Sequence, residues 1–131
     1  MNRWLGPYQE RIYAITRFVV GFLFMFHGAQ KLFGAFGRGP LPLVSQAGLG
    51  GVIEFFGGIL IAIGLFASWA AFIASGTMAV AYFQAHQPKG LWPIVNGGEL
   101  AAVYCFVFLY IAAHGSGKWS VASVMKKPSW T

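Results

Sequence analysis

Three long apolar stretches alternate with two segments rich in glycine and proline. The apolar stretches cover residues 12–33, 48–83 and 98–113. Segment 34–47 holds three glycines and two prolines, and segment 87–97 holds two of each. Glycine and proline at this density mark loops between regular elements. The pattern therefore predicts long helices joined by short loops.

The middle stretch is too long for one membrane-spanning helix. A helix needs about 20 residues to cross a bilayer core of about 30 Å, but residues 48–83 would form a helix about 54 Å long at 1.5 Å per residue. We therefore expect two helices there, joined by a tight turn near Ala67-Ser68-Trp69. The predicted fold class is all-α, an integral membrane antiparallel four-helix bundle. Residues 1–131 would form a single transmembrane domain with spans at about 12–33, 48–67, 69–86 and 98–113.

Small residues are placed where helices of such a bundle could meet. Membrane helices approach closely through glycine and alanine because these residues let the backbones touch. We expect this role for Gly21, Gly28, Gly57, Gly58, Gly64, Gly98 and Ala102.

Composition favours a membrane protein. The chain is 57% hydrophobic and 9% charged, whereas about 25% of the residues of a soluble domain are charged. These proportions argue against a disordered chain, a soluble globule and a disulfide-rich secreted module. The single cysteine, Cys105, lies in an apolar run and is interpreted as a packing residue, because one cysteine cannot form a disulfide within the chain.

The net charge of +6 comes mainly from basic residues that flank the apolar stretches. The chain has no basic stripe or basic helix, so we expect no nucleic-acid partner; the expected partner is the lipid bilayer. Four spans place both termini on one side, which carries Arg3, Arg11, Lys118, Lys126 and Lys127, with Arg17 at its border. The other side carries Lys31, Arg38 and Lys89. The positive-inside rule then places both termini in the cytoplasm.

Most polar residues of the spans fall in the same half of the predicted bundle. Ionisable side chains inside a membrane are costly and usually mark a functional site. On the predicted topology, all but Arg17 lie in the outer half, and the candidate set is His27, Gln30, Lys31, Glu54, His86, Asn96 and Glu99. His27 and Lys31 are four residues apart and therefore share one face of their helix. Lys31 is expected to pair with Glu54, Glu99 or both.

Two interpretations of this cluster stay open. It is either a buried network that fixes the register of the helices, or a ligand or redox site beneath the Gly/Pro-rich loop. A metal site is not expected, because the metal-binding spacings HxxxH and ExxH are absent and Lys31 would repel a cation. In the ligand interpretation, His27, Glu54 and Glu99 line one pocket, and Phe33 or a residue of segment 34–47 forms part of its lid. His114, past the last span, is expected to be a solvated interfacial residue.

At these residues the chain resembles the DoxX family of small four-helix membrane proteins. The resemblance covers most of the chain and rests on motifs in their order and spacing. They are Arg17-x-x-x-Gly21-Phe22, His27-Gly28-x-Gln30-Lys31-Leu32-Phe33-Gly34, Glu54-x-x-Gly57-Gly58, Gly64-Leu65, Asn96-Gly97-Gly98-Glu99-x-x-x-x-Tyr104 and Gly115-x-Gly117-x-Trp119-Ser120. The chain departs from the family at Val121 and Ala122, where an acidic residue is usual, and at Ser68-Trp69, where a basic residue is common.

The resemblance implies a multi-pass protein of the bacterial cytoplasmic (inner) membrane that is associated with redox systems. Family members are named for subunits of terminal oxidases or of thiosulfate:quinone oxidoreductase, and some associate with oxidative-stress complexes. For most members no catalytic activity is established, so the resemblance implies no reaction.

Two functions are therefore compared. The first is a redox-associated subunit that binds a quinone-like or other small ligand in the outer half of the bundle and works with a membrane or redox protein partner. The alternative is a non-enzymatic membrane scaffold, whose polar cluster only fixes helix packing and which recruits a partner protein. The oligomeric state and the identity of the ligand do not follow from the sequence.

Overall fold

The computed structural model describes residues 2–37 and 39–128, and within them the chain is helical and contains no β-strand. Arg38, which entered the charge argument, lies outside the described residues. The longer helices are α2 (Gln9–Phe33), α3 (Gln46–Ile63), α4 (Ala67–Ala81) and α6 (Glu99–His114). The shorter segments are α1 (Asn2–Leu5), η1 (Gly6–Tyr8), η2 (Ala35–Gly37), η3 (Tyr82–His86), η4 (Gln87–Lys89), α5 (Pro93–Asn96) and α7 (Val121–Val124).

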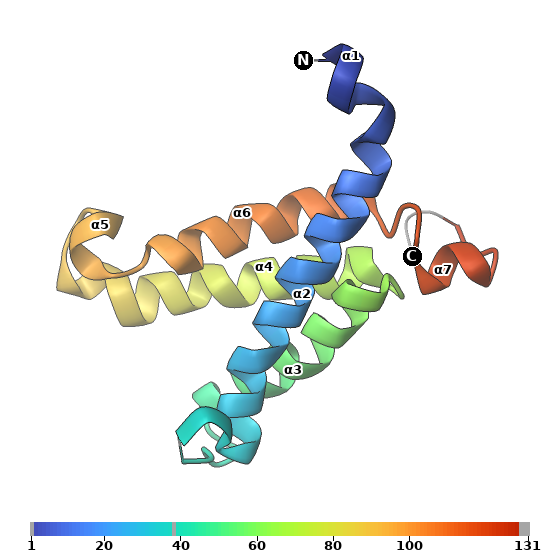
Figure 1. Cartoon of the computed structure of the whole chain (residues 1–131). Coiled ribbons are helices and arrows are strands. Elements are labelled where there is room, and N and C mark those ends of the chain that lie inside the picture. Colours follow the sequence, from blue (N-terminus) through green and yellow to red (C-terminus); the bar gives the residue numbers. More distant parts are fainter. Residues whose placement is uncertain (1, 38, 129–131) are drawn as a thin grey trace.

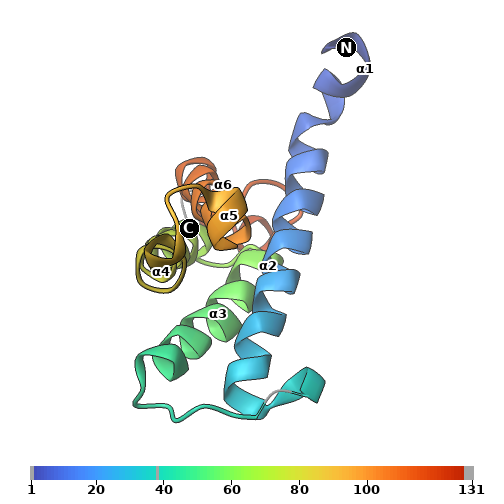
Figure 2. The same ribbon diagram turned by 90° about the vertical axis from the view of Figure 1, so that its left-hand side faces the viewer.

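The four long helices form two antiparallel hairpins. Helix α2 packs against α3, and α4 packs against α6 (Figure 1). The two hairpins cross each other and meet mainly where α3 contacts α4; in Figure 2, α4 and α6 are seen nearly end-on while α2 runs up the view. The N-terminal part of α2, with α1, projects beyond the hairpins.

Glycines allow the backbones of α2 and α3 to touch. A Cβ atom at Gly21 would lie 2.6 Å from the backbone nitrogen of Ala62, and one at Gly58 would lie 2.6 Å from the carbonyl oxygen of Gly21. Gly28 is similarly tight against the backbone of α3. The predicted packing role is confirmed for these three glycines. It is wrong for Gly57, where a Cβ would meet no other heavy atom within 4 Å.

The turn between the second and third helices lies a few residues earlier than expected. Helix α3 ends at Ile63, and Gly64 caps it in the left-handed conformation at φ 71°. Phe66 has φ 51°, and α4 begins at Ala67. The turn therefore occupies residues 64–66 rather than 67–69. The residue that ends the helix is Gly64, because glycine adopts a left-handed cap without steric cost.

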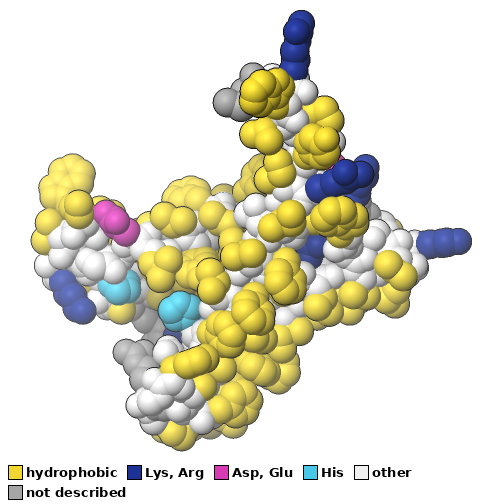
Figure 3. All heavy atoms as spheres, in the orientation of Figure 1, with side chains coloured by type: hydrophobic (Ala, Val, Ile, Leu, Met, Phe, Trp, Pro, Cys, Tyr) yellow, Lys and Arg dark blue, Asp and Glu magenta, His cyan; other side chains and the backbone are white. Residues whose placement is uncertain are grey.

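Apolar side chains cover much of the surface. Within the described residues, two helical stretches are long and apolar enough to cross a membrane, Asn2–Phe33 and Gln46–Ile63. Glu99–His114 is also apolar but shorter. The exposed apolar residues, which dominate Figure 3, include Phe18, Phe22, Phe56, Phe72, Phe83 and Phe106. A surface of this kind has the character of membrane helices.

Candidate functional site

The centre of the site is an ion pair between α2 and α3. Lys31 Nζ donates to Glu54 Oε1 at 2.7 Å, as the sequence predicted for Lys31 and Glu54. The Glu54 side chain is 3% exposed, whereas that of Lys31 is 25% exposed. The second carboxylate oxygen, Glu54 Oε2, is buried and has no hydrogen-bond partner among the described residues. A buried hydrogen-bond acceptor without a partner lowers the stability of the fold, so the space around Glu54 is a candidate site for a ligand.

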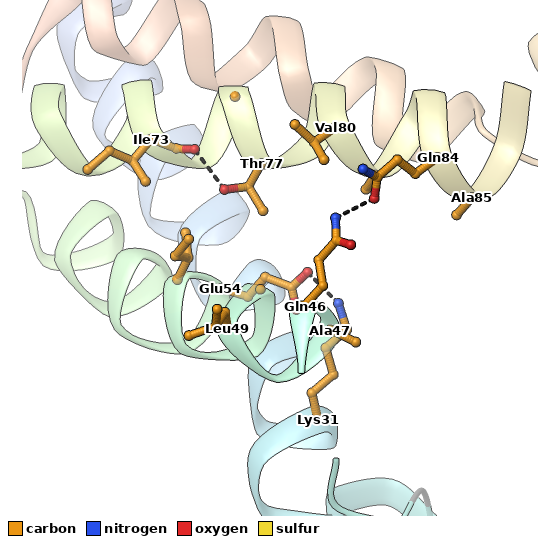
Figure 4. A pocket seen from close by; sticks show the side chains of 14 residues that line it. Lys31, Gln46, Ala47, Leu49, Glu54, Ile73, Thr77, Val80, Gln84 and Ala85 are labelled. Carbon is orange, nitrogen blue, oxygen red and sulfur yellow. Dashed lines mark hydrogen bonds and ion pairs between the residues drawn. The ribbon is translucent and has the colours of Figure 1, made fainter. Parts of the chain in front are cut away.

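A cavity of about 760 Å³ lies beside the ion pair, between α3 on one side and α4 and η3 on the other (Figure 4). Its polar lining consists of Lys31, Glu54, Gln46, Thr77 and Gln84. Its apolar lining consists of small residues together with Leu49, Ile53, Ile73 and Val80. We call this space the α3–α4 cavity. Its volume falls within the range of about 300–1,000 Å³ that is usual for small-molecule sites.

Some polar groups of the α3–α4 cavity are already engaged with each other. Gln46 Nε2 donates to Gln84 Oε1, which links the first turn of α3 to η3 (Figure 4). Thr77 Oγ1 donates to the carbonyl oxygen of Ile73, one turn earlier on α4, at 2.9 Å. Glu54 Oε2 is the buried polar atom of this lining that stays without a partner among the described residues.

A smaller cavity of about 220 Å³ also borders the ion pair. It shares Lys31, Glu54 and Ala81 with the α3–α4 cavity. The remaining lining comes from α2, α4, η3 and α6 and includes Phe24, His27, Met78, His86, Leu100 and Tyr104. The ion pair therefore contributes to the walls of both cavities.

Side chains of one π-helical segment line both cavities. Helix α4 ends at Ala81, and η3 continues the chain as a π-helix over Tyr82–His86. Gln84 lines the α3–α4 cavity, and His86 lines the smaller one. Single π-helical turns are rare and occur often at functional sites.

Asn96 belongs to the network behind this site rather than to either cavity. Its side chain is buried; Nδ2 donates to Gly90 O at 3.0 Å and to the Tyr82 hydroxyl at 3.2 Å. Its Oδ1 accepts from the backbone nitrogen of Gly98 at 2.8 Å. The Asn96 carbonyl lies 3.3 Å from His86 Nδ1. Asn96 thus fixes the loop before α6 and helps to position His86.

The remaining predicted site residues are placed apart. Gln30 lines a separate hollow of about 340 Å³ with Lys31, Gly39 and Leu41. Glu99 is exposed in the first turn of α6 and is not among the residues that line the two cavities. The expectation that Glu99 shares a pocket with His27 and Glu54 is therefore wrong. An acidic side chain in a first helical turn is favoured by the helix dipole, which gives Glu99 a local explanation.

The predicted lid is found only in part. Phe33 is exposed and is not among the lining residues of either cavity. Gln46 and Ala47, the last residues of the predicted loop segment, do line the α3–α4 cavity, but they form the first turn of α3. Within residues 2–37 and 39–128, no three His, Cys, Asp or Glu side chains come together as a metal site.

The opposite end of the fold contains polar contacts that sequence reasoning missed. Arg17 is buried and donates to the carbonyl oxygens of Ile61 and Ala62, both at 2.8 Å, and of Trp119 at 3.0 Å. It therefore caps the C-terminus of α3 and ties it to the segment after α6. The available signal was an arginine inside an apolar span, which always needs a partner.

His114 is also more engaged than expected. Its ring stacks on Tyr13 with the centroids 3.7 Å apart, and its Nε2 lies 3.2 Å from Glu10 Oε1. The expectation of a solvated residue is wrong, because α2 extends past the end of α6 and covers it.

Two residues outside the predicted candidate set also belong to the cavities. Gln84 of η3 lines the α3–α4 cavity, and Tyr104 of α6 lines the smaller one.

The fold and the site define a helical protein with apolar surface helices and a part-buried ion pair that borders two cavities. Comparison with known proteins shows to which family this helical protein belongs. The sequence profile of the DoxX family matches residues 12–87. A protein of Haemophilus influenzae that is described as uncharacterized is 42% identical over 126 residues, covering 86% of this chain and 90% of that protein. The chain belongs to the DoxX family. No solved structure matches it.

Proposed function

We propose that this protein is a multi-pass protein of the bacterial cytoplasmic membrane, with both termini in the cytoplasm. The apolar surface of the long helices and membership of a membrane-protein family support this proposal. The spans would be α2, α3, α4 with η3, and α6, which together would form one domain.

We further propose that the α3–α4 cavity binds a small quinone-like ligand. The observation that carries this proposal is a cavity of about 760 Å³ whose lining includes Lys31 and Glu54, together with the buried Glu54 Oε2, which has no partner among the described residues. A ligand that carries an O–H or N–H group, such as the reduced form of a quinone, could supply the missing hydrogen bond. A redox-associated role would follow if the bound molecule exchanges electrons with a membrane or redox protein partner.

The lining suits an amphiphile with a polar head and an apolar body. Lys31, Glu54, Gln46 and Gln84 supply polar atoms at one part of the cavity (Figure 4). Leu49, Ile73 and Val80 line it and are also exposed on the surface of the fold. An apolar tail could therefore leave the cavity into the surrounding lipid without crossing a polar layer.

The alternative is a non-enzymatic scaffold, and the Lys31–Glu54 pair gives it one supporting observation because the pair joins α2 to α3. A purely structural network would be closed, with each buried polar atom paired and no cavity beside it. The unpaired Glu54 Oε2 and the adjoining α3–α4 cavity favour the ligand site.

Filling the cavity tests the proposal. Gly76 lines the α3–α4 cavity, and a Cβ there would meet no heavy atom within 4 Å, so the side chain of Gly76→Leu can begin without a clash and take up part of the cavity. Purified wild-type protein should bind decylhydroquinone or decylbenzoquinone in isothermal titration calorimetry. Gly76→Leu should weaken the binding at least about tenfold, because the leucine side chain takes up part of the space that the ligand needs.

The matched control is Ala113→Leu, which adds a leucine at an exposed position of α6 away from both cavities. It should bind like the wild type. If the wild type binds neither compound, or if both variants bind as tightly as the wild type, the ligand proposal is wrong and the scaffold takes its place.

A further inference from the structure

We propose that the end of the fold around Arg17 contains a second site, which binds an anionic phospholipid through its phosphate group. This site is separate from the two cavities that border the Lys31–Glu54 pair. The inference rests on the proposed location of the protein in a membrane. It depends neither on the ligand of the α3–α4 cavity nor on the side of the membrane where the termini lie.

A pocket of about 240 Å³ lies where α2 packs against the last turn of α3. Arg17 and Trp119 line it together with four apolar residues, Ala14, Ile15, Phe18 and Ala62. We call it the Arg17 pocket. Ile15 and Phe18 are exposed on α2, so the pocket adjoins an apolar surface against which an acyl chain can lie.

Arg17 brings to this pocket a positive charge that has no carboxylate beside it. The side chain is 1% exposed, and it donates to three backbone carbonyl oxygens, those of Ile61, Ala62 and Trp119. Carbonyl groups at the end of a helix carry only partial negative charge. They satisfy hydrogen-bond donors of Arg17 but leave a net positive charge behind the pocket wall.

The acidic residues of the chain are placed elsewhere. There are three of them: Glu54 pairs with Lys31, and Glu99 lies in the first turn of α6. Glu10 is the acidic residue closest to Arg17 in the sequence, but its Oε1 lies 3.2 Å from His114 Nε2, on the side of α2 that faces α6. An anion that enters the Arg17 pocket would therefore meet a positive field and no carboxylate among the lining residues.

Arg11 supplies an exposed cation at the rim of the pocket. It precedes Ala14 and Ile15 by three and four residues on α2, so it shares their face of the helix. Its guanidinium carbon lies 5.8 Å from the centre of the Trp119 ring and 5.8 Å from that of the Tyr8 ring. The two rings hold the guanidinium group beside a wall of the pocket. A guanidinium group can bind two phosphate oxygens at once through parallel N–H groups.

The order of these groups along α2 favours a lipid over a free phosphate ion. Arg11 lies toward the projecting end of α2, and Ile15 and Phe18 follow one and two turns further into the span. A lipid whose phosphate contacts Arg11 would place its acyl chains along Ile15 and Phe18, whereas a free phosphate would gain nothing from them. Figure 3 shows Lys and Arg side chains next to apolar ones over this part of α2.

The test measures which lipid the purified protein binds. The protein in detergent is titrated with phosphatidylglycerol or with phosphatidylcholine of the same acyl chains, and bound lipid is counted by native mass spectrometry. Both lipids carry a phosphate, but the choline group of phosphatidylcholine cancels its charge. The wild type should bind its first phosphatidylglycerol at least about fivefold more tightly, as expected for one basic side chain at a lipid head group.

The variant is Arg11→Gln, with Arg3→Gln as the matched control. Both remove one exposed arginine from the N-terminal helical segment, but Arg3 is on α1, two turns away from Arg11. Arg17 stays unchanged because it caps α3. The preference for phosphatidylglycerol should fall to about twofold or less in Arg11→Gln and keep its wild-type value in Arg3→Gln. An equal loss in both variants would mean that the net charge and not a site decides, and would overturn the inference.

The remaining outcomes are equally decisive. A wild type without preference, or a preference that survives in Arg11→Gln, would show that there is no lipid site at the Arg17 pocket. Inorganic phosphate should displace phosphatidylglycerol no more than potassium chloride of the same ionic strength does. Specific displacement by phosphate would mean that the pocket takes a free anion and would overturn the lipid assignment. None of these measurements uses the α3–α4 cavity, so this site and the proposed ligand site can fail separately.

Discussion

At the scale of single residues, the two neighbouring glycines of α3 have different roles. A Cβ at Gly58 would lie 2.6 Å from Gly21 O and 2.6 Å from Met25 N, whereas a Cβ at Gly57 would meet nothing within 4 Å. We expect Gly58→Ala to lower the free energy of unfolding in detergent by about 1–3 kcal/mol, because the α2 and α3 backbones must separate. Gly57→Ala should be neutral or should stabilise the protein by up to about 1 kcal/mol, because alanine is the better helix former.

Equilibrium unfolding of the two variants in the same detergent measures this difference. A similar loss of stability in both would mean that helix propensity or lipid contact, and not the close approach of α2 and α3, decides the role of these glycines.

The sequence predicted the ion pair of the site but not all of its surroundings. Lys31 and Glu54 could be matched because a buried charge requires a counter-charge and few were present. The same argument predicted that Glu99 would pair with Lys31, but the side chain of Glu99 is exposed. Membrane depth alone cannot tell which way a side chain points, since that depends on the rotation of each helix about its axis. The partners of Arg17 could not be predicted either, because they are backbone carbonyl groups, which have no sequence signature.

At the scale of elements, helices could be predicted more securely than their ends. Apolar stretches of about 20 residues, separated by glycine and proline, predict long helices because the backbone must satisfy its own hydrogen bonds in lipid. The helices α2 and α6 follow the predicted spans closely. The turn after α3 was misplaced because it contains no proline and depends on the left-handed Gly64 and Phe66. The π-helical η3 gave no sequence signal at all.

Arg17 shows how the end of one element is fixed by others. The last carbonyl groups of a helix carry partial negative charge, and a buried guanidinium group there satisfies them. Arg17 of α2 supplies this cap to α3 and also binds Trp119 O. The C-terminus of α3, the middle of α2 and the chain after α6 are thereby joined at one point, remote in the fold from the Lys31–Glu54 pair.

At the scale of the whole molecule, the proposed topology makes a prediction about compartments. Fusions of alkaline phosphatase, which is active outside the cytoplasm, should be active after Gly37 and after Gly90 and inactive after the C-terminal residue. Fusions of a green fluorescent protein should give the opposite pattern. The physical reason is the excess of basic residues on the side of the termini. Activity of the phosphatase at the C-terminus would contradict the proposed arrangement of four spans.

The way in which the two hairpins pack against each other could not be predicted from the sequence. Each hairpin follows from neighbouring apolar stretches and a short connection. The crossing of the hairpins depends on the contact between α3 and α4, on the packing of Phe24 of α2 against Tyr104 and Phe108 of α6, and on the turn after α3. None of these contacts follows a repeating pattern in the sequence. The α3–α4 cavity lies along this contact, which explains why a polar cluster could be predicted and its cavity could not.

The most direct test of the central claim is to locate the ligand within the chain. A hydroquinone that carries a diazirine on the first tail carbon would be photolysed with the protein in lipid nanodiscs, and the labelled peptides would be mapped by mass spectrometry. We expect the label on α3 and α4, at lining residues such as Leu49, Ile53, Ile73 and Val80, and expect an excess of unlabelled decylhydroquinone to remove it. Labelling confined to exposed residues outside the cavity such as Phe18 and Phe22, or labelling that the competitor does not reduce, would contradict a ligand site in the α3–α4 cavity.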